Sequence, residues 1–226
     1  NIVVTTSKGK KFTANYVICT VPIGVLKSKS ITFIPALPQE KQLALKHMDM
    51  NIMDKVILTF PTVFWDNTQF IGHIPNAYFN TSTNQWRKKG QWPAFVNLNY
   101  YDKQPILIAF IAGNFAKKTE KKTNAQIKQE VLQTLKNMYP NKNIPEPIDV
   151  TITRWGENPY SRGSYASLNT EALPNNQDLV NMAAPIADGH LLFAGEGTSI
   201  AHSTTVHGAY ETGLRAAEHI KNEVQN

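Results

Sequence analysis

The stretch from Leu191 to Arg215 reads LLFAGEGTSIAHSTTVHGAYETGLR and carries the strongest indication of a fold in this chain. A short apolar strand over 191–194 runs into a Gly-Glu-Gly turn and a Ser/Thr-rich loop, which opens a helix over about 205–223. Gly195 and Gly197 allow a ligand to approach the backbone closely. The loop over 203–205 lies at a helix N-terminus, where unpaired N–H groups favour an anionic or electron-rich ligand. Taken alone, the spacing also fits a plain capped junction between strand and helix.

The rest of the chain predicts a mixed order of strands and helices. The strand candidates cover 2–6, 12–20, 56–60, 94–98, 106–111 and 148–155, and the first two form a hairpin with Gly9 at its turn. A short helix follows Pro38, and a longer one over 124–139 carries an apolar face. Polar loops are expected over 76–91 and 156–178. Without an internal repeat, this order predicts an α/β or α+β fold.

Composition excludes several classes of protein. Of 226 residues, 42% are hydrophobic and 18% charged, as in folded globular proteins, and no apolar run is long enough to span a membrane. The net charge of +6 is spread along the chain, so a nucleic-acid partner is not expected. A lone cysteine, Cys19, excludes a disulfide framework and fits a reducing, cytoplasmic compartment. His202 and His207 lie five residues apart, without helical spacing and without a carboxylate partner at the spacing of metal ligands, so no metal site is expected.

Three further blocks extend the pattern of the 191–215 stretch. They read YVICTVPIGVLK (16–27), MDKVILTFPTVFWD (53–66) and RWGENPYSRGSYASL (154–168). In order and spacing the four blocks resemble the flavin-containing amine oxidases, the family of polyamine oxidases, monoamine oxidases and flavin-type histone lysine demethylases. The resemblance is colinear over nearly the whole chain, so it outweighs the plain capped junction.

The resemblance implies FAD as cofactor and an amine as substrate. Glu196 matches the residue that binds the ribityl and pyrophosphate side of FAD, Val206 the N–H at the flavin N1 edge, and Lys55 the lysine that holds a water at flavin N5. The partial positive charge at a helix N-terminus supports the role of Val206, because reduced flavin carries negative charge at its N1 edge. The full set of implied cofactor-binding residues is Thr20, Val21, Pro22, Trp155, Gly195, Glu196, Thr205 and Val206.

Tyr160 and Tyr165 match aromatic residues near the substrate, and Thr205 matches a position that faces it. Many amine-oxidising members have tyrosine where this chain has Thr205, whereas the demethylases have a small residue. Tyr165 is therefore expected to be the remaining aromatic wall, and a bulkier substrate, or one gripped away from the flavin, becomes plausible.

The family's N-terminal GxGxxG turn, which binds the ADP half of FAD, does not occur in these residues. The chain therefore resembles the C-terminal half of the family. We expect residues 1–27 and 155–226 to form the C-terminal part of a Rossmann-like FAD-binding domain. Residues 28–154 should form a substrate-binding domain with a mixed sheet flanked by helices. FAD is expected in the full-length protein, completed by an N-terminal half, and absent from this chain alone.

The predicted function is FAD-dependent, polyamine oxidase-like oxidation of an amine C–N bond to an imine, with reduction of O2 to H2O2. The chain alone is expected to be inactive. Two alternatives stay open: a flavin-dependent methyl-lysine demethylase, which shares every motif above, and a basic binding module without enzymatic activity, which would explain the charge.

Overall fold

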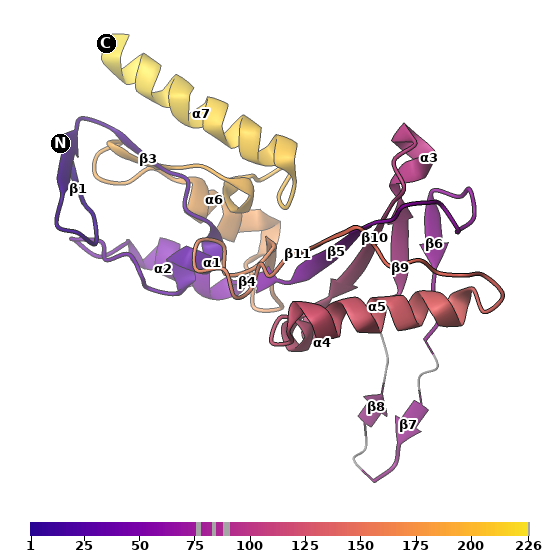
Figure 1. Cartoon of the computed structure of the whole chain (residues 1–226). Coiled ribbons are helices and arrows are strands. Elements are labelled where there is room, and N and C mark those ends of the chain that lie inside the picture. Colours follow the sequence, from indigo (N-terminus) through magenta and orange to yellow (C-terminus); the bar gives the residue numbers. More distant parts are fainter. Residues whose placement is uncertain (76–77, 83–84, 88–90, 226) are drawn as a thin grey trace. The chain divides into compact units, whose positions relative to one another are not determined.

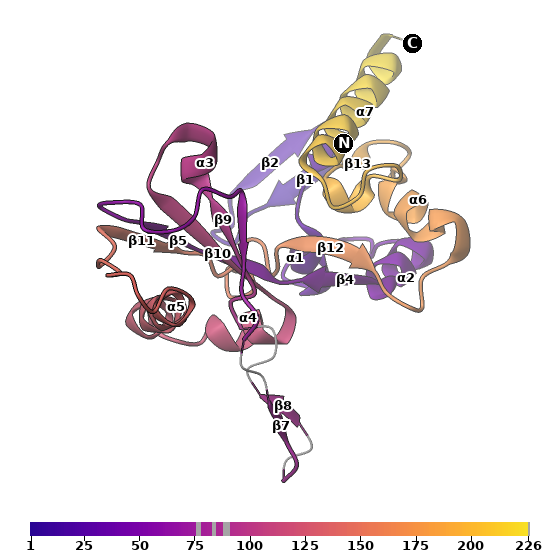
Figure 2. The same cartoon turned by 90° about the vertical axis from the view of Figure 1, so that its right-hand side faces the viewer.

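The computed structural model describes residues 1–75, 78–82, 85–87 and 91–225. The chain forms two compact units, which we call the terminal unit (Asn1–Asn51 with Asn158–Asn226) and the central unit (Ile52–Glu157) (Figures 1 and 2). The sequence predicted these boundaries after residues 27 and 154. In the structure, residues 28–51 instead group with the chain ends. Helices and strands alternate in both units, which confirms the mixed α/β class.

The central unit contains a five-stranded antiparallel sheet in the order β11-β5-β10-β9-β6. Its strands are β5 (Met53–Thr59), β6 (Phe70–Gly72), β9 (Ala94–Asn97), β10 (Ile106–Ala112) and β11 (Asp149–Ile152). The four strands predicted in this region are confirmed.

Helix α5 (Asn124–Met138) covers one face of this sheet (Figure 1), as the apolar periodicity predicted. Ile127, Val131 and Leu135 pack on the core side of the sheet, together with Val56 and Leu58 of β5. Thr123 and Gln126 cap the helix reciprocally. Burial alternates along β5, so Lys55 lies on the face opposite α5.

Two short helices and a pair of short strands complete the description of the central unit. They are α3 (Leu98–Asp102), α4 (Gly113–Thr119) and the pair β7 (Tyr78–Asn80) with β8 (Gln85–Arg87). The expected loop over 76–91 was wrong where β7 and β8 pair. Residues 76–77, 83–84 and 88–90 of that loop lie outside the described part of the chain.

In the terminal unit, β1 (Ile2–Thr5) and β2 (Lys11–Ala14) form the predicted hairpin. The second predicted strand was wrong as a single element, because the chain bends at Asn15 and continues as β3 (Val17–Cys19). Strand β3 pairs in parallel with β13 (Leu191–Phe193) instead of continuing the hairpin.

The remaining elements of the terminal unit surround two separate core clusters, one that includes Leu45 and Met48 and one that includes Leu192 and Ala216. These elements are α1 (Ile23–Lys27), α2 (Gln39–His47), β4 (Met48–Asn51), β12 (Tyr165–Leu168), the 3-10 turn η1 (Pro174–Asn176), α6 (Gln177–Ala183), the 3-10 turn η2 (Glu196–Thr198) and α7 (Val206–Gln225). The short helix after Pro38 is confirmed as α2. The expected loop over 156–178 was wrong at β12, which pairs with β4, because tertiary pairing overrides the weak local propensity of Tyr-Ala-Ser-Leu.

Among the described helices, none is both long and apolar enough to cross a membrane.

Candidate functional site

The parallel pairing of β3 with β13 brings two predicted cofactor segments to one sheet edge. Residues 20–22 directly follow β3, and Gly195 and Glu196 follow β13 after Ala194. The N–H of Ala194 donates to the carbonyl oxygen of Cys19 at 3.1 Å. In open α/β sheets, ligands bind at the carboxyl ends of parallel strands, which is where both segments lie.

Helix α7 is tied to the turn that follows β13. The N–H of Gly195 donates to the Thr212 hydroxyl at 2.9 Å, and Gly195 has a φ of 129°, which side-chain-bearing residues rarely adopt. The Arg215 guanidinium donates to the carbonyl oxygens of Phe193 and Thr198, both at 3.0 Å. The sequence reasoning missed Thr212 and Arg215. The sequence could have indicated them, because both are polar residues on the helix face that also carries the buried Gly208 and Ala216.

Glu196 joins three parts of the terminal unit. One of its carboxylate oxygens accepts the N–H of Ala166 on β12 at 3.0 Å, and the other accepts the N–H of Thr204 at 3.1 Å. Burial raises the pKa of this carboxyl, while the two backbone hydrogen bonds oppose the shift. Through Ala166 the carboxylate also places Tyr165, a predicted substrate residue, beside the turn.

The start of α7 lies against the same loop. The Thr205 hydroxyl donates to the carbonyl oxygen of His202 at 2.7 Å and accepts the N–H of Gly208 at 3.0 Å, as a helix cap does. Within the described chain, the N–H groups of Val206 and His207 have no acceptor. The Val206 side chain is 89% exposed. These features leave an open helix N-terminus at the predicted flavin position.

The expectation that His202 lacks a carboxylate partner was wrong. Its Nδ1 lies 2.8 Å from a carboxylate oxygen of Glu211, and its ring centroid is 4.8 Å from that of His207. Helix α7 brings Glu211 back over the loop, a contact that the linear spacing does not reveal. Throughout the described residues, no group of three or more His, Cys, Asp or Glu side chains has the arrangement of a metal site.

The predicted aromatic residues differ in exposure. Tyr160 is 84% exposed, whereas Tyr165 is half-buried on β12. The segment just after Tyr160 packs so closely against α1 that a Cβ on Gly24 would lie 2.7 Å from the carbonyl oxygens of Ser161 and Arg162. Tyr160 therefore precedes a segment that is held close to the Thr20–Pro22 turn.

Lys55 and Trp155 belong to the central unit, where backbone contacts link them. The Lys55 N–H donates to the Thr153 hydroxyl at 2.8 Å, and the Trp155 N–H donates to Asp54 at 3.1 Å. The Lys55 ammonium lies 5.4 Å from the ring centroid of its cross-strand neighbour Phe110. Lys55 is half-buried and Trp155 is 38% exposed.

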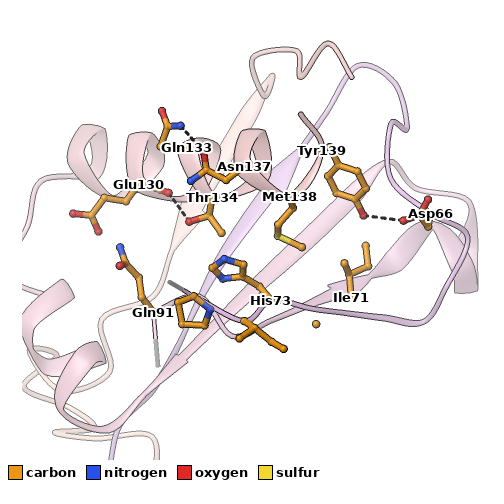
Figure 3. A pocket seen from close by; sticks show the side chains of 13 residues that line it. Asp66, Ile71, His73, Gln91, Glu130, Gln133, Thr134, Asn137, Met138 and Tyr139 are labelled. Atoms are coloured by element: carbon orange, nitrogen blue, oxygen red, sulfur yellow. Dashed lines mark hydrogen bonds between the residues drawn. The ribbon is translucent and has the colours of Figure 1, made fainter. Parts of the chain in front are cut away.

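A cavity of about 600 Å³ lies between α5 and the segment over 71–75 (Figure 3). Its two carboxylates are paired: Glu130 with Lys122 at 2.7 Å, and Asp66 with Lys142 at 3.7 Å and the Tyr139 hydroxyl at 3.3 Å. No residue predicted to bind FAD or amine lines this cavity, and it lies on the α5 side of the sheet, away from Lys55. It is therefore not part of the predicted site.

Comparison with known proteins identifies the family. The sequence model of the flavin containing amine oxidoreductases matches residues 1–221, and the chain belongs to this family. It is 38% identical over 216 residues to histone demethylase-like protein A of Aspergillus fumigatus, covering 94% of this chain and 20% of that protein. It is 34% identical over 221 residues to polyamine oxidase 3 of Oryza sativa subsp. japonica, covering 98% of this chain and 42% of that protein.

Two further similarities agree with this assignment. Lysine-specific histone demethylase 1 homolog 2 of Arabidopsis thaliana is 35% identical over 212 residues, which cover 92% of this chain and 27% of that protein. The structure of wild-type putrescine oxidase bound to putrescine aligns with a TM-score of 0.72 at 22% identity, covering 97% of this chain and 45% of that one. The structural match shows a shared fold, and the chain spans less than half of each of these proteins.

Proposed function

We propose that the natural protein containing this chain is an FAD-dependent oxidase of substituted amines. The observation that carries this proposal is the linkage made by Glu196, which holds the turn after β13, strand β12 and the loop before α7 together. The family uses FAD, and an open helix N-terminus beside the carboxyl ends of two parallel strands fits a flavin.

Residues of the turns after β3 and β13 would bind the cofactor. Thr20, Val21, Pro22 and Gly195 would line FAD with backbone. Among the described residues, and apart from the chain neighbours of Gly195, no atom lies within 4 Å of the position that a Cβ on Gly195 would take. The N–H of Val206 would face the edge of the flavin that becomes negative on reduction. When bound, FAD accepts a hydride from the carbon next to the amine nitrogen and passes the electrons to O2.

The chain's own residues would orient the substrate and control water. Tyr165, half-buried on β12, would form an apolar wall for the amine. Lys55 would hold a water molecule close to the reacting atoms, with its ammonium directed by the Phe110 ring. Trp155, an exposed indole in the central unit, would contribute an aromatic surface to the cofactor site. The amine must be neutral at nitrogen to be oxidised, and the resulting imine is hydrolysed to an aldehyde and a smaller amine.

Polyamines are the first candidate substrates, as for the polyamine oxidase relative. A methylated lysine side chain is the second, and one observation favours it. The small Thr205 uses its hydroxyl to cap α7, so it supplies no aromatic wall there. The demethylases named above are similar to this chain over almost its whole length.

The test is H2O2 production by the natural protein with spermine, spermidine, putrescine and a dimethyl-lysine peptide. Oxidation of any of these amines supports the proposed class, and the ratio of kcat/KM between spermine and the peptide identifies the substrate type. A purified protein that binds no FAD and oxidises none of them would overturn the proposal. Steeply salt-dependent retention on heparin would then favour the binding module.

A further inference from the structure

Two acidic side chains are buried side by side in the central unit. Asp54, on β5, is 1% exposed, and Glu120, directly after α4, is 7% exposed. The two carboxyl groups are close enough for a hydrogen bond between them. Two ionised carboxylates in one buried site repel each other, so such a pair is stable when it carries one proton.

The hydrogen bonds of the pair leave one position for that proton. Asp54 Oδ1 accepts the Thr153 hydroxyl at 2.9 Å and the Trp155 N–H at 3.1 Å, and one oxygen of Glu120 accepts the Gly156 N–H at 2.7 Å. Asp54 Oδ2 is buried and receives no donor from the described residues. A buried acceptor without a donor is costly, and a proton on the Glu120 carboxyl supplies the donor.

The surrounding charges do not neutralise the pair. Among the described residues, neither Asp54 nor Glu120 forms an ion pair. Arg154 instead donates to the backbone oxygens of Glu120 at 3.0 Å and Lys122 at 2.9 Å, and the Lys122 ammonium binds Glu130 at 2.7 Å. Burial, followed by the Asp54 carboxylate and the charge of Glu157, raises the pKa of Glu120 to about 7, against the opposing Gly156 hydrogen bond.

We propose that Asp54 and Glu120 share one proton and that this pair positions the turn at Trp155 and Gly156 beside Lys55. The pair holds the N–H groups of both turn residues, and the Thr153 hydroxyl that donates to Asp54 also accepts the Lys55 N–H at 2.8 Å. Gly156 is needed for this close approach, since a Cβ there would lie 2.6 Å from Glu120 Oε2. Loss of the shared proton adds a second negative charge and loosens the turn. The effect on catalysis rests on the proposed oxidase function.

The shared proton is tested by infrared spectroscopy of the natural protein between about pH 5 and about pH 9. A protonated-carboxyl band should disappear near pH 7 in the wild type and be missing in Glu120→Gln. In Asp54→Asn the band should disappear at lower pH, because the amide donates to ionised Glu120 and the repulsion is gone. The control Glu157→Gln removes a neighbouring charge and keeps the band. A wild type without a band that is lost near neutral pH, or a band that persists in Glu120→Gln, would overturn the shared proton.

The positioning role is tested by the rate at which O2 reoxidises the reduced enzyme. The amine takes no part in this half-reaction, so its own protonation does not contribute to the pH profile. The wild-type rate should fall roughly threefold to tenfold on going from pH 6 to pH 8, whereas Glu120→Gln should show a flat profile. Equal pH profiles in the two proteins would overturn the proposal that the carboxyl pair positions the turn. If Glu120→Gln does not fold, Asp54→Asn serves instead, with its inflection shifted to lower pH. A protein that binds no FAD would refute the oxidase function while the infrared result still decides the pair.

Discussion

The carboxylate of Glu196 accepts the backbone N–H of Thr204 at 3.1 Å and so fixes the loop from which α7 starts. Thr204 has a φ of 67°, a left-handed conformation that is unfavourable for a β-branched residue. The hydrogen bond to Glu196 helps to hold this conformation. The same carboxylate anchors β12, so one half-buried side chain defines the relative positions of the turn after β13, β12 and the start of α7.

Replacing Glu196 with Ala should therefore lower the free energy of unfolding by about 2 kcal/mol, because two hydrogen bonds to a charged acceptor are lost. Glu196→Gln keeps one good acceptor and should lose about half as much. Urea denaturation measures both. Glu218→Ala, whose carboxylate is exposed on the same helix as Thr212, is the control and should stay within about 0.5 kcal/mol of the wild type. An equal loss in Glu196→Ala and the control would contradict the anchoring role.

Two glycines of α7 give opposite expectations for the same substitution. A Cβ on Gly208 would lie 1.9 Å from the carbonyl oxygen of His202, whereas a Cβ on Gly213 meets no described residue within 4 Å beyond the nearby backbone of its own helix. Gly208→Ala should push the helix start away from the loop and destabilise the protein by about 2–3 kcal/mol. Gly213→Ala should stabilise it by about 0.5–1 kcal/mol through helix propensity. Thermal unfolding of the two variants checks the prediction, and equal shifts would show that the helix start is not tightly packed.

Thr205 combines a cap and a predicted substrate position, and three variants separate these roles. Thr205→Ser keeps the hydroxyl and should retain stability and selectivity. Thr205→Ala should lose about 1 kcal/mol of stability as the cap to Gly208 disappears. Thr205→Tyr should lose the cap as well, yet bind small amines more tightly by about 0.5–2 kcal/mol through the aromatic face. If kcat/KM ratios between short amines and long polyamines match in the Ala and Tyr variants, position 205 does not face the substrate.

Lys41 is a buried cation with a predictable pH dependence. It is 2% exposed and donates to the carbonyl oxygens of Asn181, Met182 and Ala184 near the end of α6, at 2.7–2.9 Å. Burial lowers its pKa from 10.5 to about 8, so above pH 8 the folded state loses a proton that the unfolded state keeps until about 10.5. The burial penalty is therefore complete below pH 8 and is relieved as the pH rises through this window.

The free energy of unfolding of the wild type, relative to Lys41→Met, should accordingly rise between pH 8 and pH 10.5, by up to about 2 kcal/mol after solvent screening. Chemical denaturation at several pH values measures this difference. Lys46→Met, which removes an exposed ammonium paired with Glu171, should show no such rise. A constant difference between the wild type and Lys41→Met would indicate that Lys41 titrates as an ordinary lysine.

Lys55→Met in the natural protein should leave FAD bound but slow turnover by about tenfold or more, because a group that holds water or moves a proton typically contributes ~10²–10⁴-fold. Stopped-flow measurement of flavin reduction and reoxidation identifies the affected step. Lys128→Met, on the exposed side of α5, is the matched control. Wild-type rates for both steps in Lys55→Met would exclude Lys55 from the mechanism.

Much of the fold could be predicted because it rests on local patterns. The apolar periodicity of 124–139 predicted α5, since burial on one face of a helix imposes this spacing. The apolar, β-branched run over 56–60 predicted most of β5. The pairings of β3 with β13 and of β12 with β4 were not predictable, because a three- or four-residue strand has little propensity of its own and its partner is distant in the sequence.

By itself, the sequence determined the family and the mixed α/β class, because the four blocks are contiguous and keep their spacing. The flavin and substrate residues that it predicts stay a prediction. Only the tertiary structure decided how those residues are supported. Thr212 and Arg215 hold the turn after β13, Glu211 pairs with His202, and Asp54 meets Glu120. The physical reason is that hydrogen bonds and repulsion between buried charges depend on distances between side chains far apart in the chain, which linear spacing does not encode.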